Sequence, residues 1–358
     1  MSRQQKKRVR VAVVDDSTFI RKAITRMLED HPRIQVVGSA GSGEELLTNL
    51  ERWRPDVVTL DLDMPGMGGL ATLDRVMAQR PTPVIILSTH SGEGAPLTIE
   101  ALHRGATDFI DKQRYSLVDF EALRGVLLER IFHVTGLGAE VADVVEEEPQ
   151  PELPEPTEPE VTIPGAYDVV VMGASTGGPP VLQRILEEMG EKVPVPVVVV
   201  QHMPVGFTEA FAERLNAYLP LRVRELVSAE RLLPHTVYIA GAGRHLRVRR
   251  EESELYAEIG TRPDDVSHIP SIDVLFESAA RGVGRRAVGV LLTGMGRDGA
   301  QGLLELKRRG AYTLAQSEES CIVFGMPRAA MVLNAVTEVG DPRQIGRRLG
   351  ELISTPAG

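Results

Sequence analysis

Cysteine is almost absent from this sequence, because the 358 residues contain only one, Cys321. A single thiol cannot form an internal disulfide framework or a cysteine metal cluster, and it makes a reducing compartment the natural setting. Long apolar runs are also missing. The longest stretches, such as residues 195–200, fit buried strands and are far shorter than the roughly 18 residues of a membrane helix. We therefore expect no direct membrane insertion.

The N-terminus is basic, but it lacks the apolar segment that export requires. The apolar run that follows the basic residues ends after four residues, at Asp15 and Asp16. That is too short for a signal peptide, whose apolar region spans roughly 7–15 residues. The sequence therefore predicts a cytoplasmic protein. The basic residues are Arg3, Lys6, Lys7, Arg8 and Arg10.

A basic surface is missing as well. The chain has 40 Lys and Arg against 50 Asp and Glu, a net charge of −10. Nine of these acids, and no base, fall in residues 140–160, so the remainder of the chain is near neutral. This distribution gives no indication of a nucleic-acid partner.

The acidic segment divides the chain. Residues 146–160 combine acids with five prolines, so they cannot form a helix or bury a core, and we expect an extended, self-repelling linker. The prediction is a first domain over residues 8–138, a linker over 139–164 and a second domain over 165–353. Both domains have a usual size.

Both domains alternate β-branched runs with helical patterns, which is typical of parallel sheets covered by helices. The predicted fold class is therefore α/β, with two doubly wound parallel sheets. Ligands of such sheets bind beyond the carboxyl ends of the strands, so the residues just after each run matter most. The expected strands are 9–14, 35–40, 57–60, 84–88 and 108–110 in the first domain, and 169–173, 195–201, 236–240, 288–292 and 311–316 in the second.

Five polar residues at or just after strand ends of the first domain should meet at one edge of its sheet. The three carboxylates among them repel one another, and such a cluster is stable at neutral pH when it holds a hard divalent cation such as Mg²⁺. With that cation and a lysine beside it, Asp61 is the best placed nucleophile for a phosphoryl group. Asp15 and Asp16 alone would equally suit capping of the following helix. The five residues are Asp15, Asp16, Asp61, Ser88 and Lys112.

The whole constellation resembles the receiver domain of response regulators over about residues 8–130. The resemblance implies a flavodoxin-like fold and a phosphoacceptor at Asp61. It also implies a Mg²⁺ ion held by Asp15 or Asp16 together with Asp61 and the backbone carbonyl of Asp63. The matching segments are VVDDS at 13–17, LDLDMPGMGG at 60–69, LS at 87–88 and GATDFIDK at 105–112.

The same resemblance assigns three further positions. Ser88 and Lys112 would contact the phosphoryl group, and Phe109 would be the switch aromatic. Gln113 stands where the family usually has proline, so the sequence does not establish the cis peptide that the family has at this loop. The charge of Lys112 is unaffected by this difference.

The second domain opens with a glycine-rich turn, GASTGGPP at residues 173–180. The pattern matches the G-x-S-x-G elbow, in which a nucleophilic serine, here Ser175, is exposed between a strand and a helix. Pro179 or Pro180 suits a helix start. A glycine-rich turn before a helix also cradles phosphate through backbone N–H groups, and the local pattern does not separate these two interpretations.

A base and an acid follow two other strands of this domain. The run 197–201 ends at His202, from which an imidazole could reach across to Ser175, and a serine nucleophile needs such a base. A third strand leads into the turn 293–300 and brings Asp298 to the same edge, where it would orient His202. The chain order Ser, His, Asp argues against the common α/β-hydrolase fold, although the roles match a triad.

Each of these residues also has an ordinary structural interpretation. Most histidines are structural or exposed, and Asp298 by itself would be read as the N-cap of a helix over residues 299–309. Backbone N–H groups of the Gly-Met-Gly turn at 294–296 could form an oxyanion hole. The remaining histidines have no comparable strand-end partner. They are His31, His90, His103, His133, His235, His245 and His268.

Over about residues 165–350 the sequence resembles the catalytic domain of the chemotaxis protein-glutamate methylesterases. The resemblance implies a Rossmann-like three-layer esterase domain with Ser175 as nucleophile, His202 as base, Asp298 as orienting acid and the Met295 N–H as an oxyanion donor. Receiver, linker and esterase in one chain make the family's own architecture. The matching segments are GASTGG at 173–178, QHM at 201–203, PSIDVLF at 270–276, LLTGMGRDGA at 291–300 and GMP at 325–327.

The family resemblance also implies what the protein acts on. The substrates would be glutamyl methyl esters on the cytoplasmic domains of methylated chemoreceptors, with methanol released and receptor glutamines deamidated by the same acyl-enzyme. The phosphodonor would be the histidine kinase of the chemotaxis pathway. Mg²⁺ would serve the receiver domain, and the esterase chemistry would need no cofactor.

Two other functions remain compatible with the residues alone. The second domain could only bind a partner, with Ser175 structural, or its glycine-rich turn could bind a nucleotide in a dehydrogenase or phosphotransferase. The turn at 173–180 lacks the G-x-G-x-x-G spacing of dinucleotide-binding turns, which argues against a nucleotide site there. No convincing helix-turn-helix follows the linker, which argues against DNA output. In the regulatory hypothesis, the receiver domain covers the strand-end face of the esterase until Asp61 is phosphorylated.

Overall fold

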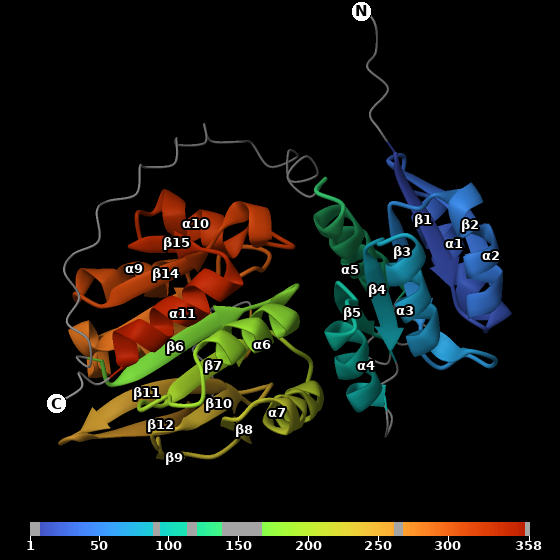
Figure 1. Cartoon of the computed structure of the whole chain (residues 1–358). Helices are drawn as coiled ribbons and strands as arrows, with labels where there is room; N and C mark the ends of the chain where they lie inside the picture. The colour runs from blue at the N-terminus through green and yellow to red at the C-terminus, as the bar shows by residue number, and fades with distance from the viewer. Residues whose placement is uncertain (1–7, 89–93, 113–119, 138–166, 261–267, 355–358) are drawn as a thin grey trace, which may run out of the picture. The chain divides into compact units, whose positions relative to one another are not determined.

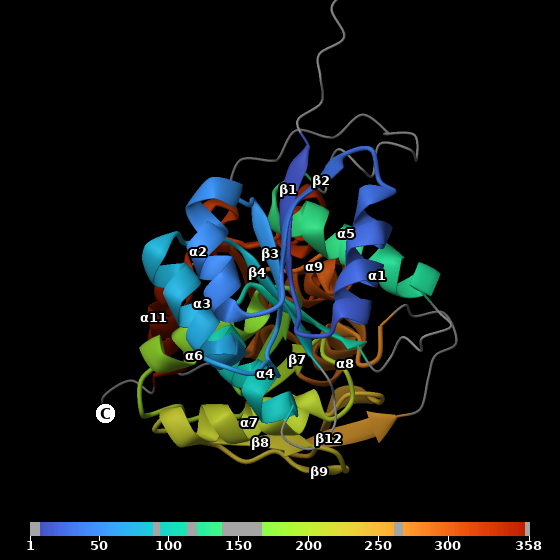
Figure 2. The same cartoon turned by 90° about the vertical axis from the view of Figure 1, so that its right-hand side faces the viewer.

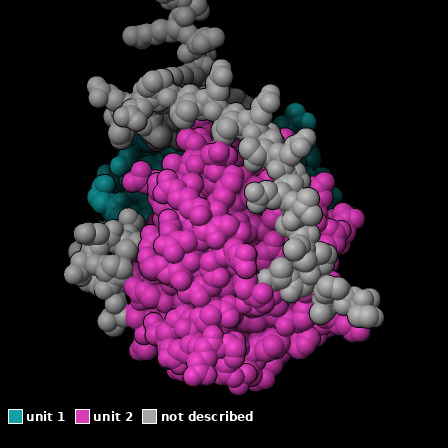
Figure 3. Space-filling model, turned by 90° about the vertical axis from the view of Figure 1, so that its left-hand side faces the viewer, with its two compact units in different colours: residues 1–148 teal, residues 149–358 magenta. Residues whose placement is uncertain are grey.

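The computed structural model of the chain describes residues 8–88, 94–112, 120–137, 167–260 and 268–354 (Figure 1). Contacts within the chain divide it into two compact units, residues 1–148 and 149–358, which have different colours in Figure 3. The predicted linker and Gln113 lie outside the described residues, and the predicted domain boundaries stay predictions.

The first unit is built on five parallel strands in the order β2-β1-β3-β4-β5. This is the strand order of the flavodoxin-like doubly wound fold, so the predicted fold class is confirmed. The predicted strands agree with the observed ones to within a residue. The strands are β1 (Val9–Val14), β2 (Ile34–Ala40), β3 (Val57–Asp61), β4 (Val84–Ser88) and β5 (Asp108–Asp111), and the helices are α1 (Thr18–Glu29), α2 (Gly43–Trp53), α3 (Gly68–Gln79), α4 (Gly94–His103) and α5 (Phe120–Val134).

Helices cover both faces of this sheet, with α1 and α5 on one face and α2 and α3 on the other (Figure 2). Alternate residues of a strand point to opposite faces. Val11 and Val13 of β1 accordingly share one core with Leu28 of α1 and Leu127 of α5. Helix α1 begins where the Ser17 hydroxyl accepts the N–H of the third residue on, a capping bond that fixes the chain just after β1. The carboxyl ends of β1, β3 and β4 therefore open at one edge of the sheet.

The second unit contains a seven-stranded parallel sheet in the order β15-β14-β13-β6-β7-β10-β8. Strand β6 is fully buried along its length, which a parallel sheet achieves when helices cover both of its faces. The strands are β6 (Val169–Ala174), β7 (Val197–Gln201), β8 (Arg222–Leu226), β10 (Thr236–Ala240), β13 (Ala287–Leu291), β14 (Tyr312–Gln316) and β15 (Glu338–Gly340). The helices are α6 (Gly178–Glu188), α7 (Phe207–Tyr218), α8 (Ile272–Gly282), α9 (Ala300–Arg308), α10 (Met326–Val332) and α11 (Pro342–Ile353), with 3₁₀ turns at Gly284–Arg286 and Glu318–Ser320.

A small antiparallel sheet completes the second unit and is not predicted from the sequence. It pairs β11 (His245–Glu251) with β12 (Glu254–Gly260) and with the short β9 (Glu230–Arg231). Strand β11 packs against α8, and its buried Leu246 and Val248 join the core that also contains the strands and α9. The hairpin of β11 and β12 thus packs against α8 and buries one of its faces.

The strand order places a switch point at β6. The chain leaves β6 for β7 on one side and returns through β13 on the other, so the carboxyl end of β6 faces a crevice between its two neighbours. Helices α8 and α9 cross closely beside it, because a methyl group at Gly302 would come within 2.6 Å of Phe276 Cβ. In the described ranges, no helix is long and apolar enough to cross a membrane.

Candidate functional sites

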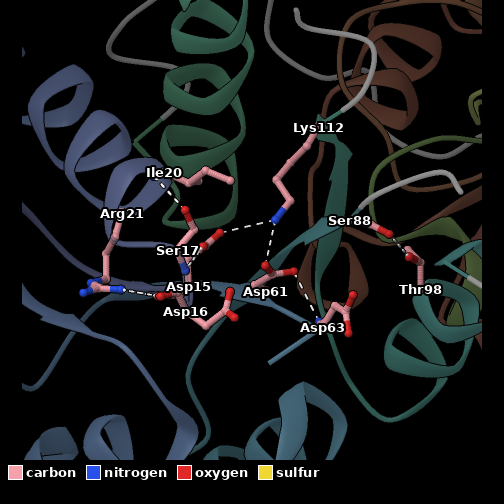
Figure 4. Close-up of polar contacts among 10 residues, drawn as sticks. All are labelled: Asp15, Asp16, Ser17, Ile20, Arg21, Asp61, Asp63, Ser88, Thr98 and Lys112. Carbon is pink, nitrogen blue, oxygen red and sulfur yellow. Dashed lines mark hydrogen bonds and ion pairs between the residues drawn. The ribbon is translucent and has the colours of Figure 1, made fainter. Parts of the chain in front are cut away.

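The predicted acidic pocket of the first unit is present at the carboxyl edge of its sheet. Asp15 and Asp61 end or follow β1 and β3, and both accept from Lys112 Nζ, at 3.3 Å and 2.8 Å (Figure 4). Asp16 is exposed, and one oxygen of each of Asp15, Asp16 and Asp61 lies within 4.8 Å of the others. Local hydrogen bonds hold the loop, since Arg21 donates to the carbonyls of Asp15 (2.7 Å) and Asp16 (3.2 Å).

The pocket has more negative charge than its lysine can balance. Burial raises the pKa of Asp61 above its ordinary value, and the neighbouring charge of Asp15 raises it further. The charge and hydrogen bond of Lys112 offset this only in part. Three carboxylates and one ammonium group leave an excess of negative charge, and the carboxylates offer oxygen ligands. Both features suit a divalent cation.

The other predicted receiver residues lie around this pocket. Ser88 ends β4, is buried, and its hydroxyl accepts from the buried Thr98 hydroxyl on α4 at 2.5 Å (Figure 4). Phe109 is buried within β5. Asp63 lies two residues beyond β3, and its N–H donates to Asp61 Oδ1 at 3.3 Å. Thr98 has no signal in the sequence, because its partnership with Ser88 depends on how α4 packs.

In the second unit, Ser175 directly follows β6 in a tight turn. Its N–H donates to the Thr293 carbonyl (3.0 Å), and its carbonyl accepts from the Gly178 N–H (2.8 Å). Gly177, at φ +76°, takes the left-handed conformation that reverses the chain into α6. A side chain at residue 177 would also meet Ile322 Cβ at 2.7 Å. The turn therefore holds Ser175 at the edge of the sheet, but its side chain is buried rather than exposed as the elbow pattern predicts.

His202 and Asp298 come together at the same edge. The His202 N–H donates to the Ala174 carbonyl (3.0 Å), which joins the ends of β6 and β7. His202 Nε2 lies 2.8 Å from Asp298 Oδ2, and both side chains are largely buried. His202 Nδ1 is buried and has no hydrogen-bond partner among the described residues. The described residues form no Ser175–His202 hydrogen bond, although the ring nitrogen that could accept the serine proton is free.

Asp298 has a second partner that the sequence does not reveal. Its carboxylate accepts from Ile272 N (2.8 Å), Asp273 N (3.0 Å) and the Ser271 hydroxyl (2.8 Å), all at the start of α8. The alternative role as N-cap of the following helix is wrong, because Gly299 occupies that position before α9. Burial opposes ionisation of Asp298, but the bonds from His202 and from the α8 backbone outweigh burial and hold the pKa of Asp298 well below its ordinary value.

The turn that contains the predicted oxyanion donor packs against Ser175. Gly294 packs on Ser175 so closely that a methyl group there would come within 2.7 Å of Ser175 Cβ. The next residue, Met295, is half-buried, and its N–H donates no hydrogen bond to any residue that the structure describes. Thr293 anchors this turn, because its hydroxyl donates to the Thr176 carbonyl at 3.0 Å. The Met295 N–H is therefore available to a ligand, in a turn that packs against Ser175.

One histidine that seemed unpartnered in the sequence belongs to this site. The His268 ring stacks on the His202 ring, with centroids 4.3 Å apart and planes parallel within 1°. The expectation that no other histidine accompanies the strand ends is therefore wrong for His268. It arrives on the loop before α8, far from any strand end, so no strand-end pattern could have indicated it.

The structure supports neither a phosphate cradle at the start of α6 nor a cysteine nucleophile. Helix α6 begins Gly178-Pro179-Pro180, and both prolines lack the N–H that a phosphate cradle needs, while the Gly178 N–H is already bonded within the turn. Cys321 is no alternative nucleophile, because burial raises the pKa of its thiol to about 12. The arrangement favours acyl transfer by a serine.

Comparison with known proteins identifies the family of each unit. A model of the CheB methylesterase family matches residues 170–349, and a model of the response regulator receiver domain matches residues 11–119. A protein-glutamate methylesterase/protein-glutamine glutaminase of Halalkalibacterium halodurans is 40% identical over 334 residues, which cover 93% of this chain and 94% of the relative. The chain belongs to the CheB methylesterase family.

Other members of the CheB methylesterase family extend the comparison. A protein of the same name from Pectobacterium atrosepticum is 38% identical over 352 residues, 97% of each chain. The crystal structure of the Thermotoga maritima CheB methylesterase catalytic domain is 34% identical, with a TM-score of 0.51, and covers 52% of this chain and 98% of that one. As a CheB-type protein, this chain is a chemotaxis-type hydrolase with a response regulator receiver domain.

Proposed function

We propose that the second unit hydrolyses glutamyl methyl esters on the cytoplasmic domains of chemoreceptors, releasing methanol, and deamidates receptor glutamines. Ser175 is the nucleophile, His202 the base and Asp298 the orienting acid. The observation that carries the proposal is that Asp298 holds His202 through Nε2 while the buried Nδ1 has no hydrogen-bond partner among the described residues. The His202 backbone N–H is bonded to the carbonyl of Ala174, the residue directly before Ser175. Family membership supplies the ester class.

The reaction proceeds through an acyl-enzyme. Ser175 Oγ bonds to the γ-carbonyl carbon of the substrate while its proton passes to His202 Nδ1, and the carbonyl oxygen becomes an oxyanion that accepts from the Met295 N–H. Asp298 stabilises the imidazolium that forms. His202 returns the proton to the methoxy oxygen as the C–O bond breaks, and methanol leaves.

Water completes the cycle. It gives a proton to His202 and bonds to the acyl carbon, and Ser175 Oγ departs with the proton from His202, leaving a glutamate carboxyl group. A glutamine substrate follows the same path with ammonia as the leaving group. None of these steps uses a group other than this chain's own residues, substrate and water.

Hydroxylamine tests the acyl-enzyme directly. Methylated receptor membranes, the full-length protein and hydroxylamine at neutral pH should give receptor γ-glutamyl hydroxamate well above the level seen with Ser175→Ala. The variant measures the uncatalysed reaction of the ester with hydroxylamine. Methanol release by the wild type with hydroxamate no higher than in the Ser175→Ala control would mean that water attacks the ester without an acyl-enzyme.

In the first unit, Asp61 accepts a phosphoryl group from the histidine kinase of the chemotaxis pathway. The clustered oxygens of Asp15, Asp16 and Asp61 fit a Mg²⁺ ion, with the Asp63 carbonyl as a further ligand. Mg²⁺ would neutralise charge on the transferring phosphoryl group. Lys112, already between Asp15 and Asp61, is the cation that contacts the phosphoryl oxygens.

Two residues respond to the charge of the phosphoryl group on Asp61 by changing their positions. The Ser88 hydroxyl, which accepts from Thr98, donates its own proton to a phosphoryl oxygen, and Phe109 is the switch aromatic that follows it. Phosphorylation then shifts the equilibrium between inhibited and active arrangements of the two units. With acetyl phosphate and Mg²⁺, methanol release should rise in the wild type and stay at its basal rate in Asp61→Asn; an equal rise in both would contradict control through Asp61.

Mg²⁺ should stabilise the receiver domain at neutral pH. Because the pKa of Asp61 is raised on folding, the folded state loses stability as pH rises from the ordinary aspartate range through that raised value. A bound cation recovers this loss, by about 2.7 kcal/mol at 100 times its Kd, and protons compete with it in acid.

The check is calorimetric unfolding of the full-length protein with and without Mg²⁺ at pH 5 and pH 7.5. We expect a larger upward shift of the receiver transition at pH 7.5, and almost none in Asp61→Asn, whose transition without Mg²⁺ should already lie above that of the wild type. Asp74→Asn, at an exposed ion pair on α3, is the matched control and should respond like the wild type. A shift of equal size in Asp61→Asn would place the cation elsewhere.

Gln201 should position both the nucleophile and the base. It is buried at the end of β7, and its Nε2 donates to the carbonyls of Ser175 (2.8 Å) and His202 (3.2 Å). Gln201→Met keeps the volume but removes both bonds, so kcat for methanol release should fall by about 10²-fold, with a stability loss of about 1–3 kcal/mol. Gln183→Met, at a half-buried position of α6 where the amide donates to Glu187 (2.8 Å), should leave kcat unchanged. An unchanged kcat in Gln201→Met would show that strand packing alone positions the two loops.

A further inference from the structure

A second histidine is buried behind the proposed esterase site. His245 begins β11, is fully buried, and its Nδ1 accepts a hydrogen bond from the Ser271 N–H at 3.2 Å. The two residues are 26 positions apart in the chain, so this bond joins the antiparallel hairpin to the start of α8. The hairpin is thereby connected to the segment that holds Asp298.

Ser271 passes this connection on to the proposed triad. Its hydroxyl donates to Asp298 Oδ1 at 2.8 Å and caps α8 by accepting from the Val274 N–H at 3.4 Å. The other carboxylate oxygen of Asp298 lies 2.8 Å from His202 Nε2. A continuous series of bonds therefore runs from His245 through Ser271 and Asp298 to His202.

The bond to Ser271 defines the protonation state of His245. An N–H can donate only to an imidazole nitrogen that carries no proton, so Nδ1 is bare and the single proton of the neutral ring is on Nε2. Burial lowers the pKa of His245, and the charge of Arg247 lowers it further, which agrees with a neutral ring.

The neutral ring leaves its Nε2–H group without a hydrogen-bond acceptor. Nε2 is buried and has no hydrogen-bond partner among the described residues. Buried groups of this kind are uncommon and destabilising, so a purely structural core position would be better occupied by an apolar side chain. What an apolar side chain could not supply is the acceptor for the Ser271 N–H.

We propose that His245 is a positioning residue of the esterase, which fixes Ser271 through Nδ1 and thereby holds Asp298 against His202. This inference rests on the proposed function, because it assumes that the Asp298–His202 pair serves catalysis. His245 itself touches no substrate. Its effect on the reaction is entirely through the placement of the carboxylate.

The test compares three substitutions at this position in the full-length protein. In His245→Asn the side-chain oxygen falls where Nδ1 was and accepts from Ser271, so kcat for methanol release should stay within about threefold of the wild type. In His245→Gln the oxygen falls nearer the Nε2 position, and in His245→Leu it is absent. Both should lower kcat by about 10-fold to 100-fold with little change in KM, as misplacement of a catalytic group does.

Stability is separated from positioning by a control in the same strand. Val248→Ala removes buried apolar volume from β11 without touching Ser271 or Asp298, so it should lower the melting temperature and leave kcat unchanged. His245→Asn and His245→Gln have similar polarity, so if His245→Leu does not fold, the comparison of these two still decides. Wild-type kcat in His245→Gln, or an equal loss in His245→Asn, overturns the proposal.

A spectroscopic measurement needs no variant. In ¹⁵N-histidine NMR of the wild type, His245 should show an unprotonated Nδ1 and a protonated Nε2 across neutral pH, and the opposite tautomer would overturn the proposal. Ser175→Ala keeps the two hypotheses apart. If Ser175→Ala still releases methanol, the proposed function fails; if only the wild type does and His245→Gln equals it, the positioning role alone fails.

Discussion

Ser175→Ala should lower methanol release from methylated receptor membranes by about 10⁶-fold, since removing the nucleophile of a serine triad costs about as much as removing the whole triad. The fold should not change, because the hydrogen bonds that place Ser175 in its turn come from its backbone N–H and carbonyl, to Thr293, Gly178 and Gln201. The readouts are methanol release and the melting temperature of the second unit.

The control for this substitution is within the same molecule. Ser175→Ala should accept phosphate at Asp61 at the wild-type rate, which shows that the preparation is folded and competent in its first unit. Retention of more than a few per cent of the wild-type methanol release would contradict nucleophilic catalysis. It would favour a second unit whose output is binding, with Ser175 structural.

Asp298→Asn should slow methanol release by about 10⁴-fold, as the corresponding change does in serine proteases. Asp298 Oδ2 accepts from His202 Nε2 and the Ile272 N–H, and Oδ1 accepts from Ser271 and Asp273. An amide has only one acceptor oxygen, so its NH₂ must face one of these pairs of donors. Facing His202, it forces the proton to Nδ1, where the ring can no longer accept the proton of Ser175.

The same substitution should destabilise α8. Losing part of the carboxylate cap should cost about 1–3 kcal/mol at neutral pH. The folded pKa of Asp298 is lowered, so its contribution is present above the ordinary aspartate pKa and is lost as pH falls towards the folded value. Urea unfolding of wild type and variant should therefore differ most near pH 7 and converge in acid.

Asp273→Asn is the matched control for Asp298→Asn. Asp273 lies in the first turn of α8, the turn that Asp298 caps, but its carboxylate accepts from the Gly302 N–H (2.7 Å) and forms no hydrogen bond with His202. Burial raises the pKa of Asp273 to about 6, with the charge of Asp298 adding to it, so its ionised form opposes folding above that pH. The control should keep wild-type kcat and be no less stable at pH 8; activity lost equally in both variants would mean that general disturbance of α8, not the histidine tautomer, slows the reaction.

Strands buried on both faces are predictable from this sequence, whereas the half-exposed strands of the second unit are not. Runs such as Val197–Gln201 consist of β-branched residues without alternation, which is typical of the centre of a parallel sheet. Strand β11 reads His-Leu-Arg-Val-Arg-Arg-Glu, and its arginines hide a buried side that begins with His245 and Leu246. β15 has only three residues, Glu338–Gly340, at the edge of its sheet. Short polar edges of this kind leave too little periodicity to recognise.

The positions of the strand ends explain which site residues the sequence predicts and which it does not. Asp15, Asp61, Ser175 and His202 all end or directly follow buried strands, and parallel strands bring their carboxyl ends to one edge. His268, His245 and Thr98 come from a loop, a hairpin and a helix, and their contacts depend on packing between elements far apart in the chain. The second role of Asp298, on a helix that precedes it in sequence, could not be read for the same reason.

The most direct test of the account is methanol release from methylated receptor membranes by the full-length protein, with and without acetyl phosphate and Mg²⁺. The proposed triad and the Asp61 site together predict release that is measurable without phosphodonor and rises when it is added. No release in either condition, from folded protein with a matched receptor, would contradict the esterase, and release indifferent to phosphodonor would contradict its control by the receiver.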